Sequence, residues 1–141
     1  MRLFAILPIF ILLVLQIAAP SAAANTCGLP DEAGRWVNPQ AKDKGDLTLI
    51  VVQHDCDTKG ADQWMIRARV KCPRRDCIWG FGGGKRAADG TLVALIKTFA
   101  ADRWLVLRVA NDQLIINVMN EYRSGNTGPR RQAAQMIRAD E

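Results

Sequence analysis

Five cationic side chains are concentrated in one short stretch of this 141-residue chain, whose formal net charge is +5. Arg67, Arg69 and Lys71 alternate with apolar residues, and Arg74 and Arg75 follow them. On a β-strand, residues two positions apart project from the same face about 6.5–7 Å apart, so these cations repel one another unless anions neutralise them. The row predicts a surface that binds a polysaccharide, a lipid head group, nucleic acid or an acidic protein. The alternative is a solvated sheet face on which cross-strand Asp or Glu residues pair with the cations.

Aromatic residues near this row extend the same prediction. Trp79 and Phe81 come shortly after it and are expected to add stacking or apolar contact to a bound anion. Trp64, Phe99 and Trp104 fall in or beside predicted strands, and we expect them to pack in the core.

His54 is the chain's sole histidine, so any imidazole-based acid–base or nucleophilic mechanism must centre on it. It lies in His54-Asp55-Cys56-Asp57, where a predicted strand runs into a turn. The chain has no G-x-S-x-G nucleophile motif, and its acidic residues occur mostly singly at turns. We therefore expect a solvated loop histidine, no catalytic residue and a protein that is not an enzyme. A hydrolase that uses His54 is the enzymatic alternative.

The segment Gly80-Phe81-Gly82-Gly83-Gly84-Lys85 is the one candidate for a phosphate-binding loop. Trp79 stands where the Walker pattern has its first glycine, and Arg86 replaces its Ser or Thr. The dinucleotide pattern fails as well, because Lys85 falls at its third glycine. We expect no nucleotide cofactor, and a flexible or bulged strand segment at a barrel corner instead.

The first 24 residues predict a secretory signal peptide. Arg2 precedes an uncharged, mostly apolar run over residues 3–19, and the small residues Ala22-Ala23-Ala24 follow, as at a cleavage site. The run is shorter than the roughly 20 apolar residues of a transmembrane anchor. We expect residues 25–141 to form one domain that is exported to the periplasm or the exterior and does not span the membrane.

Cys27, Cys56, Cys72 and Cys77 all follow the predicted signal peptide. An even number of cysteines in a small exported domain predicts two disulfides. Of the three possible pairings we favour Cys72–Cys77, which brackets a turn-like stretch, together with Cys27–Cys56. A zinc site with His54 as a fourth ligand is the alternative, but these spacings depart from C-x2-4-C, and we expect no metal.

The remaining pattern predicts a meander of short antiparallel strands. Residues 64–72 alternate between apolar and mostly charged side chains, whereas residues 47–53 form a continuous apolar run typical of a buried strand. Hairpin turns are predicted at Asp89-Gly90, Ala101-Asp102 and Asn111-Asp112. They separate predicted strands over residues 85–88, 91–99, 103–110 and 113–122.

A polar tail is predicted over about residues 124–141, in which residues 131–139 fit either a short helix or a last strand. The spacing of the strands predicts an all-β fold, an up-and-down antiparallel barrel, with a β-sandwich as the alternative.

Gly34-Arg35-Trp36-Val37-Asn38 resembles the G-x-W motif on the first strand of the lipocalin and avidin groups. The resemblance implies an exported up-and-down barrel that binds a ligand. It also implies that Trp36 packs near one barrel end under an arginine of the last strand, and Arg123 is the candidate. The resemblance carries over this architecture and this pair, not a biotin site. The block Lys71–Gly80 is similar to a group of small exported bacterial domains and implies no particular activity.

These observations favour an exported, non-enzymatic barrel that binds a small molecule or an anionic envelope component. The expected binding residues are Arg67, Arg69, Lys71, Arg74, Arg75 and Trp79. The alternative function is a periplasmic interaction module, such as an inhibitor of an envelope hydrolase, with the Cys72–Cys77 loop as the contact.

Overall fold

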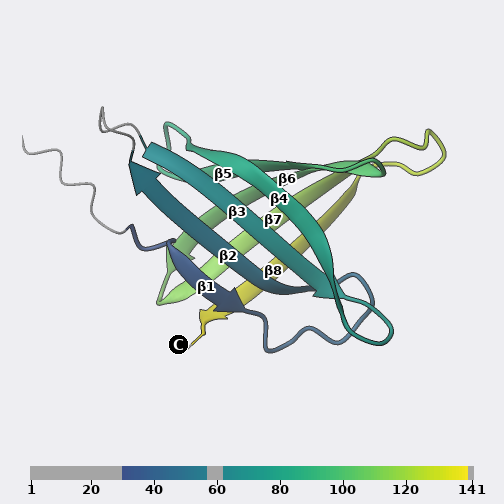
Figure 1. Cartoon of the computed structure of the whole chain (residues 1–141), viewed down its shortest axis with the longest axis horizontal. Helices are drawn as coiled ribbons and strands as arrows, with labels where there is room; N and C mark the ends of the chain where they lie inside the picture. The colour runs from purple at the N-terminus through teal and green to yellow at the C-terminus, as the bar shows by residue number, and fades with distance from the viewer. Residues whose placement is uncertain (1–29, 57–61, 140–141) are drawn as a thin grey trace, which may run out of the picture.

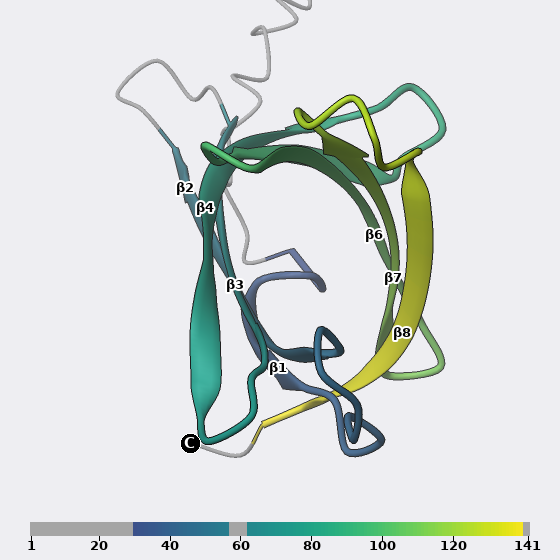
Figure 2. The same ribbon diagram turned by 90° about the vertical axis from the view of Figure 1, so that its right-hand side faces the viewer.

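The computed structural model describes residues 30–56 and 62–139. In these ranges the chain forms eight antiparallel strands that close into one up-and-down barrel (Figures 1 and 2). The strands are β1 (Gly34–Val37), β2 (Leu47–Cys56), β3 (Asp62–Lys71), β4 (Asp76–Arg86), β5 (Leu92–Lys97), β6 (Ala101–Ala110), β7 (Gln113–Tyr122) and β8 (Arg130–Arg138). Each strand pairs with the next, and β8 pairs with β1. The predicted barrel is confirmed, while the predicted signal peptide lies outside the described residues.

The alternation of side chains decides which face of each strand is turned inward. In β3 the apolar positions are buried and the intervening positions are exposed, as the sequence predicts. In β2 a register irregularity between Leu47 and Leu49 lets both Leu47 and Ile50 enter the core cluster, and farther along the strand alternation resumes, with Gln53 exposed. Residues 47–53 therefore form a strand that is only in part as deeply buried as their continuous apolar sequence predicts. Side chains from every strand pack into one hydrophobic cluster inside the ring seen in Figure 2.

The glycine cluster lies within β4, and close packing against β5 requires a glycine at Gly82. A Cβ atom at Gly82 would lie 2.0 Å from the backbone oxygen of Leu95, so no other residue fits there without a shift of the backbone. Opposite β3, a register irregularity makes Trp79 an extra residue between Ile78 and Gly80. The segment over residues 80–85 is therefore part of a strand, as predicted, with the bulge at Trp79 just before it, and Gly82 serves strand packing.

Two of the predicted turns are present where they were expected. Asn111 and Asp112 have φ angles of 51° and 58° and connect the paired residues Ala110 and Gln113, as a two-residue hairpin requires. The turn at Asp89-Gly90 is longer than predicted, because β4 ends at Arg86 and β5 begins at Leu92.

The turn predicted at Ala101-Asp102 is wrong, because both residues belong to β6. The chain reverses over residues 98–100 instead. The Thr98 hydroxyl both accepts a hydrogen bond from the Ala101 backbone N–H (3.2 Å) and donates one to the Ala101 carbonyl (3.0 Å). A side chain thus fixes this reversal, and side-chain capping of this kind leaves a weaker sequence signal than an Asn-Gly or Asp-Gly pair.

The C-terminal segment completes the barrel. Strand β8 pairs with β7 from Asn120↔Arg130 to Gln113↔Ile137 and with β1 at Trp36↔Arg138. Residues 131–139, for which helix and strand were both open, are therefore almost entirely strand, and the prediction of a polar tail is wrong beyond the loop before Arg130. No helix with the length and hydrophobicity to cross a bilayer occurs in the part of the chain described.

Candidate functional site

The five predicted cations lie together on the outside of the barrel. Strand β3 turns Arg67, Arg69 and Lys71 outward, opposite Phe81, Ile78 and Asp76 of β4. All three cations are exposed, as are Arg74 and Arg75 in the loop that follows. We refer to Arg67, Arg69, Lys71, Arg74 and Arg75 as the basic row.

No residue of the basic row has an ion-pair partner among residues 30–56 and 62–139. The ion pairs found there join His54 to Asp62, Arg86 to Glu32 and Arg123 to Asp102. Asp76 stands opposite Lys71 in the β3–β4 ladder, but their charged atoms do not come within ion-pair distance. The described residues therefore do not form the alternative predicted from the sequence, a solvated face on which Asp or Glu residues of neighbouring strands pair with the cations.

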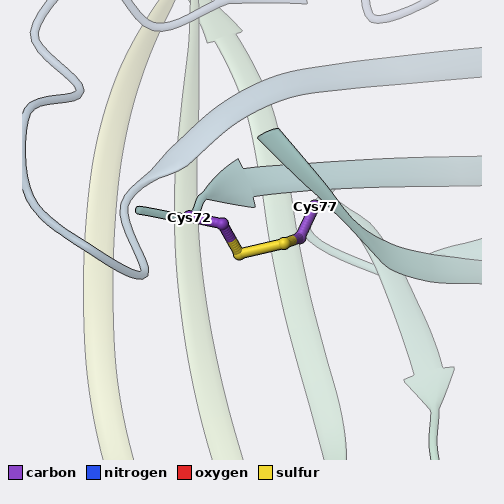
Figure 3. The surroundings of a disulfide bond; sticks show 2 residues. All are labelled: Cys72 and Cys77. Carbon is purple, nitrogen blue, oxygen red and sulfur yellow. A yellow bond between two sulfur atoms is a disulfide. The ribbon is translucent and has the colours of Figure 1, made fainter. Parts of the chain in front are cut away.

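The loop that carries Arg74 and Arg75 is closed by a disulfide. Cys72 and Cys77 are bonded, with their Cα atoms 5.8 Å apart (Figure 3), so this predicted pair is confirmed. The disulfide ties the end of β3 to the start of β4 and limits how far the two arginines can move from the strand cations. Cys27 lies outside the described residues, and the Cys27–Cys56 pair stays a prediction.

Two large apolar side chains project beside the basic row. Ile78 and Phe81 are 78% and 68% exposed. With Arg67 and Arg69 they line an open surface groove of about 400 Å³. A second groove, of about 700 Å³, continues along Arg69, Arg75, Asp76, Cys77 and Ile78. Cationic and apolar groups are therefore interleaved on this face.

Trp79, predicted to belong to this surface, lies on the other side of the sheet. It packs against the hydrophobic core, and the Arg103 guanidinium lies 4.5 Å from the centre of its ring. The cause is the β4 bulge, which turns Ile78 outward and Trp79 inward. The prediction that Trp79 belongs to the binding surface is wrong. Ile78 lies on the outer face instead, whereas regular alternation from Phe81 would have turned it inward.

Trp64, Phe99 and Trp104 were expected to pack in the core, and one of the three does so. Trp64 is 6% exposed and belongs to the core. Phe99 is 97% exposed because it lies in the reversal between β5 and β6. Trp104 is 39% exposed because it is on the outer face of β6, where it lines a groove of about 510 Å³ with Val106 and Met119.

Trp36 is covered by Arg138 and not by Arg123. The Arg138 guanidinium lies 4.2 Å from the centre of the Trp36 ring and donates hydrogen bonds to the carbonyls of Ala33 and Asp31, each at 2.7 Å. Arg123 follows β7 at the opposite end of the barrel and pairs with Asp102. The predicted pair fails because β8, not β7, is the last strand. The arginine that covers Trp36 belongs to β8.

A second arginine, Arg86, lies at the same barrel end as Trp36 and binds the segment that precedes β1. Arg86 donates two hydrogen bonds to the Glu32 carboxylate, at 2.8 and 3.0 Å, and lies 4.9 Å from the centre of the Trp64 ring. These bonds lower the pKa of Glu32, despite the opposing effect of its burial, and raise that of Arg86. The backbone carbonyl of Glu32 accepts a further bond from the Trp36 indole N–H at 2.9 Å. We refer to the barrel end formed by Glu32, Trp36, Trp64, Arg86 and Arg138 as the capped end.

His54 is part of this end and is not a solvated loop residue, so that prediction is wrong. Its side chain is only 5% exposed, its ring centre is 4.3 Å from that of Trp64, and its Nε2 is 3.0 Å from Asp62 Oδ1. Cys56 completes a group of three possible metal ligands within 4.8 Å of one another. Free cysteines are absent from the described residues, however, so His54 and Asp62 are the two donors that this group offers to a metal ion.

Comparison of the chain with protein-family models, with curated proteins and with solved structures gives no match.

Proposed function

We propose that this protein is an exported, non-enzymatic binding protein whose basic row attaches to the anionic lipid head groups of the cell envelope. The observation that carries the proposal is the unpaired state of the five cations in the described part of the chain. Support for export comes from the predicted signal peptide and from the Cys72–Cys77 disulfide, since disulfides persist mainly in oxidising compartments.

The electrostatics of the basic row favour an anionic ligand. Two unit charges about 7 Å apart repel by roughly 0.6 kcal/mol in water and by about 2 kcal/mol at the effective dielectric of a protein surface. The row contains several such neighbours, and no described carboxylate neutralises them. An anionic surface removes this repulsion and adds about 1 kcal/mol of attraction for each Lys or Arg that comes close to it.

The apolar side chains favour a lipid surface over a free polyanion. Ile78 and Phe81 project from the row with most of their surface in water. An interfacial protein buries such side chains at the boundary between head groups and acyl chains while its cations contact the head groups. A polysaccharide or a nucleic acid would use the cations and leave Ile78 exposed.

The disulfide-closed loop favours a second candidate, a protein-interaction module such as an inhibitor of an envelope hydrolase. The loop presents Arg74 and Arg75 at the tip of the β3–β4 hairpin. In this case Arg74→Glu together with Arg75→Glu abolishes capture of one defined protein from a periplasmic extract and leaves vesicle binding unchanged.

The test of the main proposal is sedimentation of the disulfide-bonded protein with vesicles of phosphatidylglycerol and phosphatidylcholine. Arg67→Glu combined with Arg69→Glu is expected to reduce binding at least tenfold. The matched control is Arg108→Glu combined with Arg131→Glu, which changes the net charge equally on the exposed outer face of β6 and β8 and is expected to lose much less. Equal losses in the two double variants would contradict the proposal, because they would show a response to net charge alone.

Phe81→Ser separates the lipid surface from a free polyanion. It is expected to weaken vesicle binding severalfold and to leave binding to heparin unchanged. If heparin binds the wild-type protein tightly and the vesicles do not, the ligand is a polysaccharide.

A further inference from the structure

We propose that the barrel has a second binding site at the end opposite the capped end, where Arg103 and Asn120 hold a small anion that carries a hydroxyl group. This site is separate from the basic row and does not depend on the function proposed for it. The chemical class is a hydroxycarboxylate or a hydrogen phosphate, in which an anionic oxygen and an O–H donor are carried by neighbouring carbon atoms or by one phosphorus atom.

Arg103 and Asn120 are direct neighbours on the inward face of two adjacent strands. They stand opposite each other in the β6–β7 ladder and are 9% and 4% exposed. Both follow the alternation that buries Leu105 on β6 and Val118 on β7. Two polar side chains thus occupy inward-facing positions, which elsewhere on these two strands hold core residues.

Arg103 differs from the other arginines that have hydrogen-bond partners. Arg86 has Glu32, Arg123 has Asp102, and Arg138 has two backbone carbonyls. Within the described ranges, no carboxylate lies within ion-pair distance of Arg103.

The partners of Arg103 leave its charge uncompensated. Its Nη1 donates to the Thr98 hydroxyl at 2.8 Å, and its guanidinium lies against the Trp79 ring. Its Nε is buried and has no hydrogen-bond partner in the described part of the chain. Burial lowers the pKa of Arg103, against a smaller opposing influence of Tyr122. A buried cation without a counter-charge is costly, and an anionic ligand supplies the missing charge.

Asn120 defines the second requirement on the ligand. Its Nδ2 donates to the Arg130 carbonyl at 3.4 Å, whereas its Oδ1 is buried and has no hydrogen-bond partner among residues 30–56 and 62–139. An acceptor beside a cation is best satisfied by a molecule that offers an oxygen anion to the guanidinium and an O–H to the amide. Glycolate and hydrogen phosphate have both groups, whereas acetate has only the first.

The experiment is thermal unfolding of the disulfide-bonded protein in chloride, acetate, glycolate and phosphate at constant ionic strength. Glycolate and phosphate are expected to raise Tm by roughly 10 °C at a hundredfold excess over Kd, and acetate by less. Arg103→Met is expected to abolish these differences. The Arg67→Glu, Arg69→Glu variant keeps them, which separates this site from the basic row.

A second variant tests the site even where Arg103→Met does not fold. Asn120→Asp places an internal carboxylate opposite Arg103 and is expected to raise Tm in chloride and remove the response to glycolate. Asn117→Asp, on the exposed face of the same strand, is the matched control and keeps the response. The proposal is overturned if wild-type Tm is the same in all four anions, or if either Arg103→Met or Asn120→Asp responds like the wild type. The first result would mean that no anion binds at Arg103 and Asn120, and the second that the anions act at another place.

Discussion

The capped end and the basic row both contain arginines, but they use them in opposite ways. At the capped end, Arg86 and Arg138 bond to a carboxylate and to backbone carbonyls and lie over the rings of Trp64 and Trp36. On the outer face of β3, Arg67 and Arg69 have no ion-pair partner among the described residues. The comparison separates cations that hold the barrel together from cations that are free to meet a ligand. Substitutions at the two places should therefore affect different measurements.

The largest effect on stability is expected at Arg138. Arg138→Met removes the contact with Trp36 and leaves the Ala33 and Asp31 carbonyls without their donor, at a cost of about 2–3 kcal/mol. Urea unfolding measures this loss. Arg130→Met, at the exposed start of the same strand, is the control and should stay within about 0.5 kcal/mol of the wild type. Similar values for the two variants would mean that Arg138 does not anchor the lead-in.

A smaller loss, of about 1–2 kcal/mol at pH 7, is expected for Glu32→Gln, because the bidentate bond to Arg86 loses its charge. Since the pKa of Glu32 is lowered in the folded protein, its contribution is complete above its unfolded pKa. That contribution is lost as the pH falls through the folded pKa. Urea unfolding at pH 7 and at acid pH should therefore show a wide gap between wild type and variant that narrows in acid.

The exposed Glu121, which has no ion pair in the described ranges, provides the control for this prediction. Glu121→Gln is expected to follow the wild type at both pH values. If the Glu32→Gln gap stays constant with pH, the Glu32 carboxylate does not stabilise the capped end through its charge.

The smallest effect on stability is expected in the basic row. Arg69→Gln should change the free energy of unfolding by less than about 0.5 kcal/mol, and in the stabilising direction, because it relieves repulsion from its neighbours. The same variant should bind anionic vesicles several times more weakly. If Arg69→Gln lost as much stability as Glu32→Gln, this would contradict the distinction between the cations of the basic row and those of the capped end.

Features that depend on local alternation and turn chemistry are predictable from this sequence. Residues 64–72 indicate the outward cations because side chains of a strand alternate between its faces, and Asn111-Asp112 indicates a hairpin because both residues tolerate positive φ. The predicted barrel follows from these signals.

Features that depend on pairing between distant segments are not predictable in this way. The inward position of Trp79 results from a bulge that only the register against β3 defines. The partner of Trp36 depends on which strand is last, and the polar composition of residues 131–139 left that open. Arg103 and Asn120 do not stand out in the sequence, because their strands contain other polar residues and only pairing brings these two together.

The most direct test of the central claim is the partition of the wild-type protein between water and vesicles at two salt concentrations. We predict binding to vesicles that contain phosphatidylglycerol at low salt, weaker binding at 0.5 M salt, where charges farther apart than about 4–5 Å are screened, and no binding to pure phosphatidylcholine. Equal partition into both kinds of vesicle, or none into either, would contradict the assignment of the basic row to anionic lipid head groups.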